Sequence, residues 1–177
     1  MIKPSSAQLL VTWDDYHRAI EELALKIQAS GWQFDQVLCL ARGGLRPGDV
    51  LSRLFRLPLA ILSTSSYRDD AGTTRGTLDI ASNFTSTAGP LSGGILLVDD
   101  LVDSGVTLLK VQQHLQTHCP LVTEVRSAVI WYKACSVTEP DYYVDYLPDN
   151  PWIIQPFEDY DDLTLDNLRM RMHKHKS

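Results

Sequence analysis

The stretch from Ile95 to Thr107, ILLVDDLVDSGVT, constrains this chain more than any other part of it. It opens with the apolar residues 95–98, a run short enough for a strand buried on both faces of a parallel sheet. Two adjacent carboxylates, Asp99 and Asp100, stand where that strand should end, and a helical pattern of apolar residues begins at Leu108. A buried strand, a short polar turn and a helix start indicate an α/β fold with a parallel sheet.

The polar turn in this stretch is a ready site for an anion. Free backbone N–H groups and the helix dipole both favour a phosphate at a helix start, and the Ser104 and Thr107 hydroxyls can add hydrogen bonds. The carboxylates of Asp99, Asp100 and Asp103 would repel a phosphate, so they must serve sugar hydroxyls, a metal ion or a proton. The stretch therefore predicts one loop that grips a phosphate and a neighbouring polyol together.

Strands and helices alternate along the rest of the chain. Thr12 is placed to cap a first helix, with Asp15 as in a capping box, and Gly31 follows as a stop. We expect strands at 36–41, 59–62, 124–131 and 141–146, and further helices at 49–55, 108–119 and 163–172. This alternation predicts a central parallel sheet flanked by helices, in a single domain spanning 1–177. Its C-terminal helix and tail, about 165–177, should be partly frayed.

Composition excludes several classes of protein. The net charge of −6 with scattered basic residues argues against non-specific nucleic-acid binding. No apolar run approaches the ~20 residues of a membrane span, and the first residues lack a signal-peptide core. The cysteines, an odd and widely spaced set of three, are typical of reduced thiols in a cytoplasmic protein.

Polar segments follow the expected strands at four places, and parallel strands bring such segments to one edge of the sheet. They are Arg42–Gly44, Ser65–Tyr67, Asp99–Thr107 and Lys133. A tight turn alone would explain the two glycines, and solvated charge would explain the aspartate pair. The combination Asp-Asp-x-x-Asp-Ser-Gly-x-Thr after a buried strand is much more specific than either part. The polar segment 68–76 is typical of a mobile loop, and loops of this kind are often lids.

The residues 98–107 resemble the ribose-phosphate binding motif of type I phosphoribosyltransferases. These enzymes transfer 5-phosphoribose from 5-phosphoribosyl-1-pyrophosphate (PRPP) to a nitrogenous base and release pyrophosphate. The similarity extends from about Val37 to Glu158, and the order of its motifs is similar to that of the bacterial xanthine-guanine enzymes. The resemblance implies the type I fold, with a small hood over the base site, and purine salvage from PRPP and a 6-oxopurine.

The resemblance also implies a role for each motif that handles PRPP. Asp99 and Asp100 would accept hydrogen bonds from the ribose hydroxyls, with Asp100 also near Mg²⁺. The 5′-phosphate would lie in a cradle made by Asp103, Ser104, Gly105, Val106 and Thr107. Pyrophosphate would be held by Arg42, Gly43, Gly44, Ser66, Tyr67 and, as a lid residue, Arg75, and the peptide beside Arg42 is often strained or cis in the family.

The base-binding roles are implied in the same way. Asp103 is the candidate acid or base at purine N7; its alternative is a structural aspartate in a loop turn. Lys133 would donate to the 6-oxo group, and Trp152 would stack on the base. Ile153 and Glu158 would face the purine 2-position. Without the resemblance, a lysine at a strand end would be read as solvated and Trp152 as core.

Some features depart from the family's pattern or leave alternatives open. The loop after Tyr67 is longer than in the xanthine-guanine enzymes, and Phe157 stands where tryptophan is usual, next to Glu158 in place of a shorter acid. The preference among guanine, xanthine and hypoxanthine therefore stays open. The alternatives are a non-catalytic PRPP-sensing regulator of the same fold and an enzyme for another base. Relatives of this kind are commonly homodimers or homotetramers. The basic tail after Arg169 has no assigned role.

Overall fold

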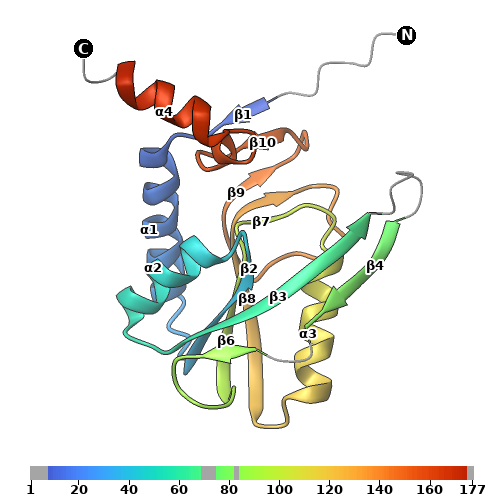
Figure 1. Ribbon diagram of the computed structural model, residues 1–177. Helices are drawn as coiled ribbons and strands as arrows, with labels where there is room; N and C mark the ends of the chain where they lie inside the picture. Colours follow the sequence, from blue (N-terminus) through green and yellow to red (C-terminus); the bar gives the residue numbers. More distant parts are fainter. Residues whose placement is uncertain (1–7, 69–74, 82–83, 175–177) are drawn as a thin grey trace. The chain divides into compact units, whose positions relative to one another are not determined.

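The computed structural model describes residues 8–68, 75–81 and 84–174, with the backbone only for 65–68, 75–79, 173 and 174. Contacts within the chain define two compact units, which we describe separately. The larger unit, Ala19–Asn150, contains the sheet shown in Figure 1, and the smaller one combines the N-terminal residues up to Arg18 with Pro151–Ser177. The expectation of one domain over 1–177 stays a prediction.

The larger unit is built on a mostly parallel sheet. Its strand order is β4-β3-β2-β6-β8-β7, with β5 pairing β3 and β9 pairing β8. The pairs β2–β3, β2–β6, β6–β8, β8–β7 and β8–β9 are parallel, and β4 and β5 are antiparallel to β3. The strands are β2 (Gln36–Ala41), β3 (Leu59–Arg68), β4 (Arg75–Ile80), β5 (Thr85–Ser86), β6 (Gly93–Val98), β7 (Leu101–Val102), β8 (Val122–Lys133) and β9 (Tyr142–Leu147). The predicted parallel α/β fold is therefore confirmed.

The strand order contains one point at which the chain changes direction across the sheet. β2 and β6 are neighbours, but the strand after β2 lies on its outer side and the strand after β6 lies on the opposite side. Loops that leave two such strands diverge and open a crevice at their carboxyl ends, where ligands bind in open α/β sheets. The strand order therefore puts the loop after Ala41 and the loop after Val98 on either side of that crevice.

Helices cover both faces of this sheet. In Figure 1 the part of α1 (Trp13–Ala29) that belongs to this unit, from Ala19 on, and α2 (Leu45–Phe55) lie on one side of the strands, and α3 (Val106–His118) lies on the other. Since both faces are covered, β6 is apolar throughout, and its residues Ile95–Val98 have no exposed surface. The core on the α3 side includes Leu38, Leu40, Leu62, Ile95, Leu97, Leu108, Val111 and Leu115.

Helix ends agree with the sequence at α1 and differ at α2. The backbone N–H of Asp15 donates to Thr12 Oγ1 at 3.2 Å, and the N–H of Thr12 donates to Asp15 Oδ2 at 3.3 Å, which confirms the capping box. The helix expected at 49–55 begins earlier, at Leu45, so Pro47 and Gly48 lie inside its first turns. Proline is tolerated there because the first N–H groups of a helix have no partner within it.

Two strands are longer than expected. The strand predicted at 59–62 continues to Arg68, so the prediction that the polar segment 65–67 comes after the strand is wrong. Antiparallel pairing with β4 satisfies the backbone of this polar segment, which its side-chain pattern did not reveal. The strand predicted at 124–131 runs to Lys133, which is therefore its last residue. The predicted mobile loop 68–76 lies largely outside the described residues.

The smaller unit contains a short parallel pair that the side-chain pattern did not predict, β1 (Gln8–Leu10) with β10 (Trp152–Ile154). The unit ends with a 3₁₀ turn at Glu158–Tyr160 and helix α4 (Leu165–Lys174). The Tyr16 ring is fully buried and meets Phe157 edge to face, with ring centroids 5.7 Å apart. Phe157 thus packs against the start of α1, and this contact accounts for an aromatic residue at that position.

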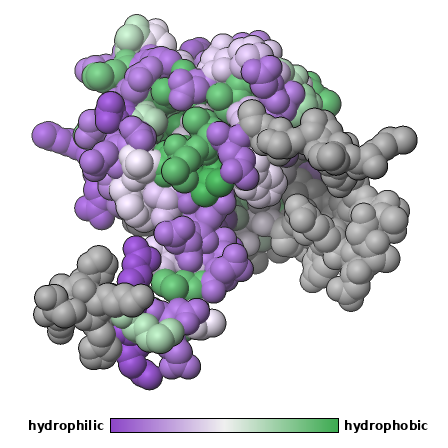
Figure 2. Space-filling model, turned by 90° about the horizontal axis from the view of Figure 1, so that it is seen from above, coloured by the Kyte–Doolittle hydropathy of each residue, from purple (hydrophilic) through white to green (hydrophobic). Residues whose placement is uncertain are grey.

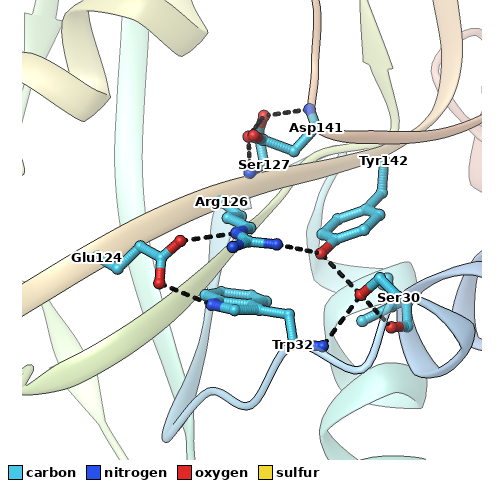
Figure 3. Close-up of polar contacts among 8 residues, drawn as sticks. Ser30, Trp32, Glu124, Arg126, Ser127, Asp141 and Tyr142 are labelled. Carbon is cyan, nitrogen blue, oxygen red and sulfur yellow. Dashed lines mark hydrogen bonds and ion pairs between the residues drawn. The ribbon is translucent and has the colours of Figure 1, made fainter.

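A polar cluster joins the first residues of β8 to the loop after α1 (Figure 3). The Arg126 guanidinium lies 4.7 Å from the ring centroid of Trp32 and donates to Glu124 Oε1 at 2.7 Å and to the Tyr142 hydroxyl at 3.0 Å. Trp32 Nε1 donates to Glu124 Oε2 at 2.8 Å. Beside them, Asp141 Oδ2 accepts from the N–H and the hydroxyl of Ser127 at 2.8 and 2.7 Å. These contacts are structural, because the predicted site residue Lys133 lies at the other end of β8.

Replacing Asp141 with alanine should lower the free energy of unfolding by about 2–3 kcal/mol. The buried Ser127 would lose the acceptor for both its N–H and its hydroxyl, and unpaired buried donors are costly. Urea unfolding measures the change, with Asp145→Ala at an exposed position of β9 as the control. A loss no larger than that of the control would contradict the prediction.

The face of the molecule in Figure 2 is mainly hydrophilic, with apolar residues gathered in small patches. Within the described part of the chain, every helix is too short or too polar to cross a lipid bilayer.

Candidate active site

The loop after β6 forms a pocket of about 250 Å³. Its lining comes from this single segment: Asp99, Asp100, Leu101, Val102, Asp103, Ser104, Gly105, Thr107 and Leu108. The short strand β7 anchors the loop, because Val102 is buried in the core and the Asp100 carbonyl accepts from Ile130 N–H at 2.9 Å. The segment that the sequence singled out therefore does form a concave site, and packing against β8 holds its shape.

The first two carboxylates line this pocket at the end of β6. The backbone N–H of Asp100 donates to Asp99 Oδ1 at 3.0 Å, and the N–H of Leu101 donates to Asp100 Oδ1 at 2.8 Å. Burial raises the pKa of Asp99 well above its usual value, and the neighbouring Asp100 charge acts in the same direction. The backbone amides of Asp100 and Gly44 partly oppose this shift. The pair thus combines one half-buried acid with a second carboxylate beside it.

The part of the loop that was predicted to bind phosphate leads into α3. Gly105, the N-cap residue of the helix that begins at Val106, has a left-handed backbone (φ 77°) and no side chain of its own to cap the helix. The first N–H groups of a helix have no partner within it, so this end of α3 can bind an anion. Ser104 Oγ accepts weakly from Val106 N–H at 3.4 Å and stays at the pocket wall with Thr107. This geometry fits the predicted phosphate cradle.

The loop after β2 packs directly against the carboxylates. A Cβ atom placed on Gly43 would lie 2.6 Å from Cγ of Asp100, and one on Gly44 would lie 2.9 Å from the Leu40 backbone. Only glycine permits this close approach. The peptide bond between Ala41 and Arg42 is cis, as the resemblance implied. The structure therefore brings together the predicted pyrophosphate residues 42–44 and the predicted ribose residues.

Lys133 and Asp103 form an ion pair. Lys133 Nζ lies 3.3 Å from Asp103 Oδ1, and the lysine side chain is 10% exposed while that of the aspartate is 63% exposed. A lysine with so little exposed surface normally needs a partner, and here it has the carboxylate at the pocket wall. The pair was not predicted, although both residues were predicted site residues. It places a cationic donor and a carboxylate side by side.

The remaining predicted site residues lie on other elements of the fold. Ser66 and Tyr67 are backbone positions of β3, and Arg75 begins β4, where it is paired with Arg68. Their side chains lie outside what the structure describes. Trp152, Ile153 and Glu158 belong to the smaller unit, where Trp152 is 60% exposed and Ile153 is buried. Their predicted roles, like those of the other site residues, stay predictions.

Sequence reasoning missed the residues that brace the pocket from the neighbouring loop. Cys135, Ser136 and Thr138 follow β8 and lie against Asp103 and Gly105. Nothing in their local sequence indicates this contact, because the sheet brings together loops that are separated along the chain.

Comparison with known proteins identifies relatives of this chain. The phosphoribosyl transferase domain family matches residues 12–162. The chain is 28% identical over 155 residues to the xanthine-guanine phosphoribosyltransferase of Idiomarina loihiensis, covering 87% of this chain and 89% of that protein. It is 30% identical over 149 residues to the protein of the same name from Gluconobacter oxydans, covering 84% and 83%.

The fold also has relatives among solved structures. The crystal structure of a purine phosphoribosyltransferase from Pyrococcus horikoshii matches with a TM-score of 0.70 and 28% identity, over 85% of this chain and 93% of that one. The family match spans the βα unit with the pocket, the glycine loop and Lys133. The resemblance drawn from the sequence is therefore confirmed, and the chain belongs to the phosphoribosyltransferase family of transferases.

Proposed function

We propose that this protein transfers 5-phosphoribose from PRPP to N9 of a 6-oxopurine, with Mg²⁺, in cytoplasmic purine salvage. The products are the nucleoside monophosphate and pyrophosphate. The relatives named xanthine-guanine phosphoribosyltransferase support the substrate class. The feature of the site that carries the proposal is the ion pair between Lys133 and Asp103.

This ion pair matches one edge of a 6-oxopurine. O6 and N7 are neighbouring atoms on that edge, and both accept hydrogen bonds in guanine. With Lys133 Nζ and Asp103 Oδ1 only 3.3 Å apart, the lysine can donate to O6 while the carboxylate faces N7. Adenine presents an amino donor in place of O6, which a lysine ammonium would repel. The arrangement therefore favours guanine, hypoxanthine or xanthine over adenine.

The same placement supplies a route for the proton. In the reaction the bond between N9 and C1 of the ribose forms while the bond from C1 to the pyrophosphate oxygen breaks. A purine that carries its proton on N7 must lose it as N9 attacks, and Asp103 is placed to accept it. Asp99 and Asp100 accept hydrogen bonds from the ribose hydroxyls, and the start of α3 holds the 5′-phosphate. Arg42 and the glycines after it hold the pyrophosphate.

The residues present fit a magnesium ion that is bound mainly by substrate and water. Mg²⁺ usually takes one or two protein carboxylates together with substrate phosphates. Asp99 and Asp100 offer such carboxylates, and the described residues contain no cluster of three or more His, Cys, Asp or Glu side chains suited to a metal. When bound beside Asp100, the ion would neutralise charge on the departing pyrophosphate.

Pyrophosphate release tests the proposal directly. The protein is incubated with PRPP and Mg²⁺ and, in separate reactions, guanine, xanthine, hypoxanthine, adenine, uracil or orotate. Release with one or more of the first three bases alone is the expected result. Release only with another base would identify a different phosphoribosyltransferase. PRPP binding without release for any base would favour a PRPP-sensing regulator.

Lys133→Met should reduce kcat/KM for 6-oxopurines by about 10²-fold, because the donor to O6 is lost while the apolar stem is kept. The KM for PRPP should change little, since the proposed partner of Lys133 is the base and not PRPP. Steady-state kinetics with guanine and hypoxanthine measure the effect, and Lys110→Met at an exposed position of α3 is the control. An unaltered profile of base use would remove Lys133 from the base site.

The predicted homodimer or homotetramer is part of the proposal. Light scattering of the purified protein measures its mass, and a monomer would contradict the prediction.

A further inference from the structure

Residues 134–138 (the 134–138 loop) are the first part of the segment that links β8 to β9, and they contact the pocket loop at successive residues. The N–H of Val137 donates to the carbonyl of Ser104 at 2.9 Å. A Cβ atom on Gly105 would lie 2.9 Å from Thr138 Cγ2 and 3.0 Å from Thr138 N. The two loops therefore touch where the pocket loop turns into α3, and the positive φ and lack of a side chain at Gly105 permit the contact.

The residue of this loop nearest to the reaction chemistry is Cys135. Its Sγ lies 3.5 Å from both the carbonyl oxygen and Oδ1 of Asp103. The same Oδ1 lies 3.3 Å from Lys133 Nζ. The Asp103 side chain, which is 63% exposed, thus has two donors to its carboxylate, and both come from one short stretch of chain.

The loop that carries this thiol is itself well braced. The N–H of Cys135 donates to Asn150 Oδ1 at 2.8 Å, and the N–H of Ala134 donates to the Leu147 carbonyl at 3.1 Å. Ser136 Oγ donates to the carbonyl of Thr138 at 2.6 Å. A braced loop can hold a side chain in one orientation, which a free surface loop cannot.

The Cys135 thiol is protonated and can therefore donate a hydrogen bond. Burial raises the pKa of Cys135, the Asp103 carboxylate raises it further, and the Lys133 charge opposes this. Near neutral pH the group is therefore a protonated thiol, and its S–H is a weak donor for a carboxylate oxygen.

We propose that Cys135 is a positioning residue, whose thiol, together with the Lys133 ammonium, holds the Asp103 carboxylate in the orientation that proton transfer requires. The inference rests on the proposed function of Asp103 for its catalytic meaning, whereas the contact itself is a property of the folded chain. The two can be tested separately.

Thiol alkylation tests the contact without reference to activity. The full-length protein reacts with iodoacetamide at fixed neutral pH, and peptide mass spectrometry follows each cysteine. Because thiolate is the reactive form, Asp103→Asn should speed alkylation of Cys135 at least about twofold, and Lys133→Met should slow it. Cys119, at the end of α3, and the buried Cys39 are internal controls whose rates should not change. Opposite effects of the two substitutions would not arise from a general loosening of the fold.

Kinetics test the positioning role. Cys135→Ala should lower kcat about tenfold and leave the KM for PRPP nearly unchanged. Its unfolding midpoint in urea should stay close to that of the wild type. Cys135→Ser keeps a donor at the same position and should recover most of kcat.

The possible results distinguish the contact, the positioning role and the proposed function from one another. Cys135 alkylation that ignores both substitutions would overturn the contact, even in a fully active enzyme. If alkylation responds as expected but Cys135→Ala keeps full kcat, the positioning role is overturned and the proposed function stands. The same holds if Cys135→Ser does not recover the kcat lost in Cys135→Ala. A wild-type protein that releases no pyrophosphate with any base would overturn the proposed function, and the catalytic meaning of the contact with it.

Discussion

Replacing Asp103 with asparagine should lower kcat by about 10²–10³-fold, the range typical for loss of a general acid or base. The amide has almost the same size and shape as the carboxylate, but it cannot take up the purine proton. In the proposed function the 5′-phosphate is bound by backbone N–H groups at the start of α3, so PRPP affinity should stay near that of the wild type. Steady-state pyrophosphate release gives kcat, and calorimetry gives the dissociation constant for PRPP.

The control for this substitution is Asp162→Asn, an exposed aspartate in the smaller unit. It removes the same charge at a residue outside the pocket lining and should leave kcat unchanged. Unchanged turnover in Asp103→Asn would show that this residue is only a structural member of the loop turn. A large loss of PRPP affinity instead of turnover would make it a phosphate-site residue.

The second large effect is expected at Gly43. Adding a methyl group there places a carbon 2.6 Å from Cγ and 2.8 Å from Oδ2 of Asp100, so the carboxylate must move. In the proposed function Asp100 positions the reacting sugar, and a displacement of about 1 Å at such a group can cost about 10²-fold in rate. We therefore expect Gly43→Ala to reduce kcat/KM for PRPP by about 10²-fold. The folded structure should survive, because the colliding group is a side chain at the pocket wall.

Gly89→Ala is the matched control for Gly43→Ala. Gly89 has a positive φ of 59°, and a Cβ atom there would meet nothing within 4 Å. This control should lower stability by roughly 1 kcal/mol, from backbone strain alone, without changing kinetics. Urea unfolding and PRPP kinetics on both variants separate the two effects. Normal PRPP kinetics in Gly43→Ala would contradict the tight packing between the loops after β2 and β6.

Much of the secondary structure was predictable because it depends on neighbours along the chain. The capping box at Thr12 and Asp15 and the buried strand 36–41 appear where their patterns predicted them. The failures share a physical cause. The polar strand at 65–67 is stabilised by pairing with β4, and α2 begins at Leu45 because its first turn tolerates Pro47. Tertiary pairing and backbone geometry override side-chain pattern at such places.

The amino-acid sequence by itself determined the strand, turn and helix of the pocket loop, because a short stretch of chain contains both the apolar run and the donors that an anion needs. Its motif also determined the family. Only the tertiary structure decided which distant groups meet there. The order β2-β6-β8 sets Gly43 against Asp100 on one side and brings Lys133 and Cys135 to Asp103 on the other. The physical reason is that parallel strands align the loops at their carboxyl ends regardless of how far apart those loops are in the chain.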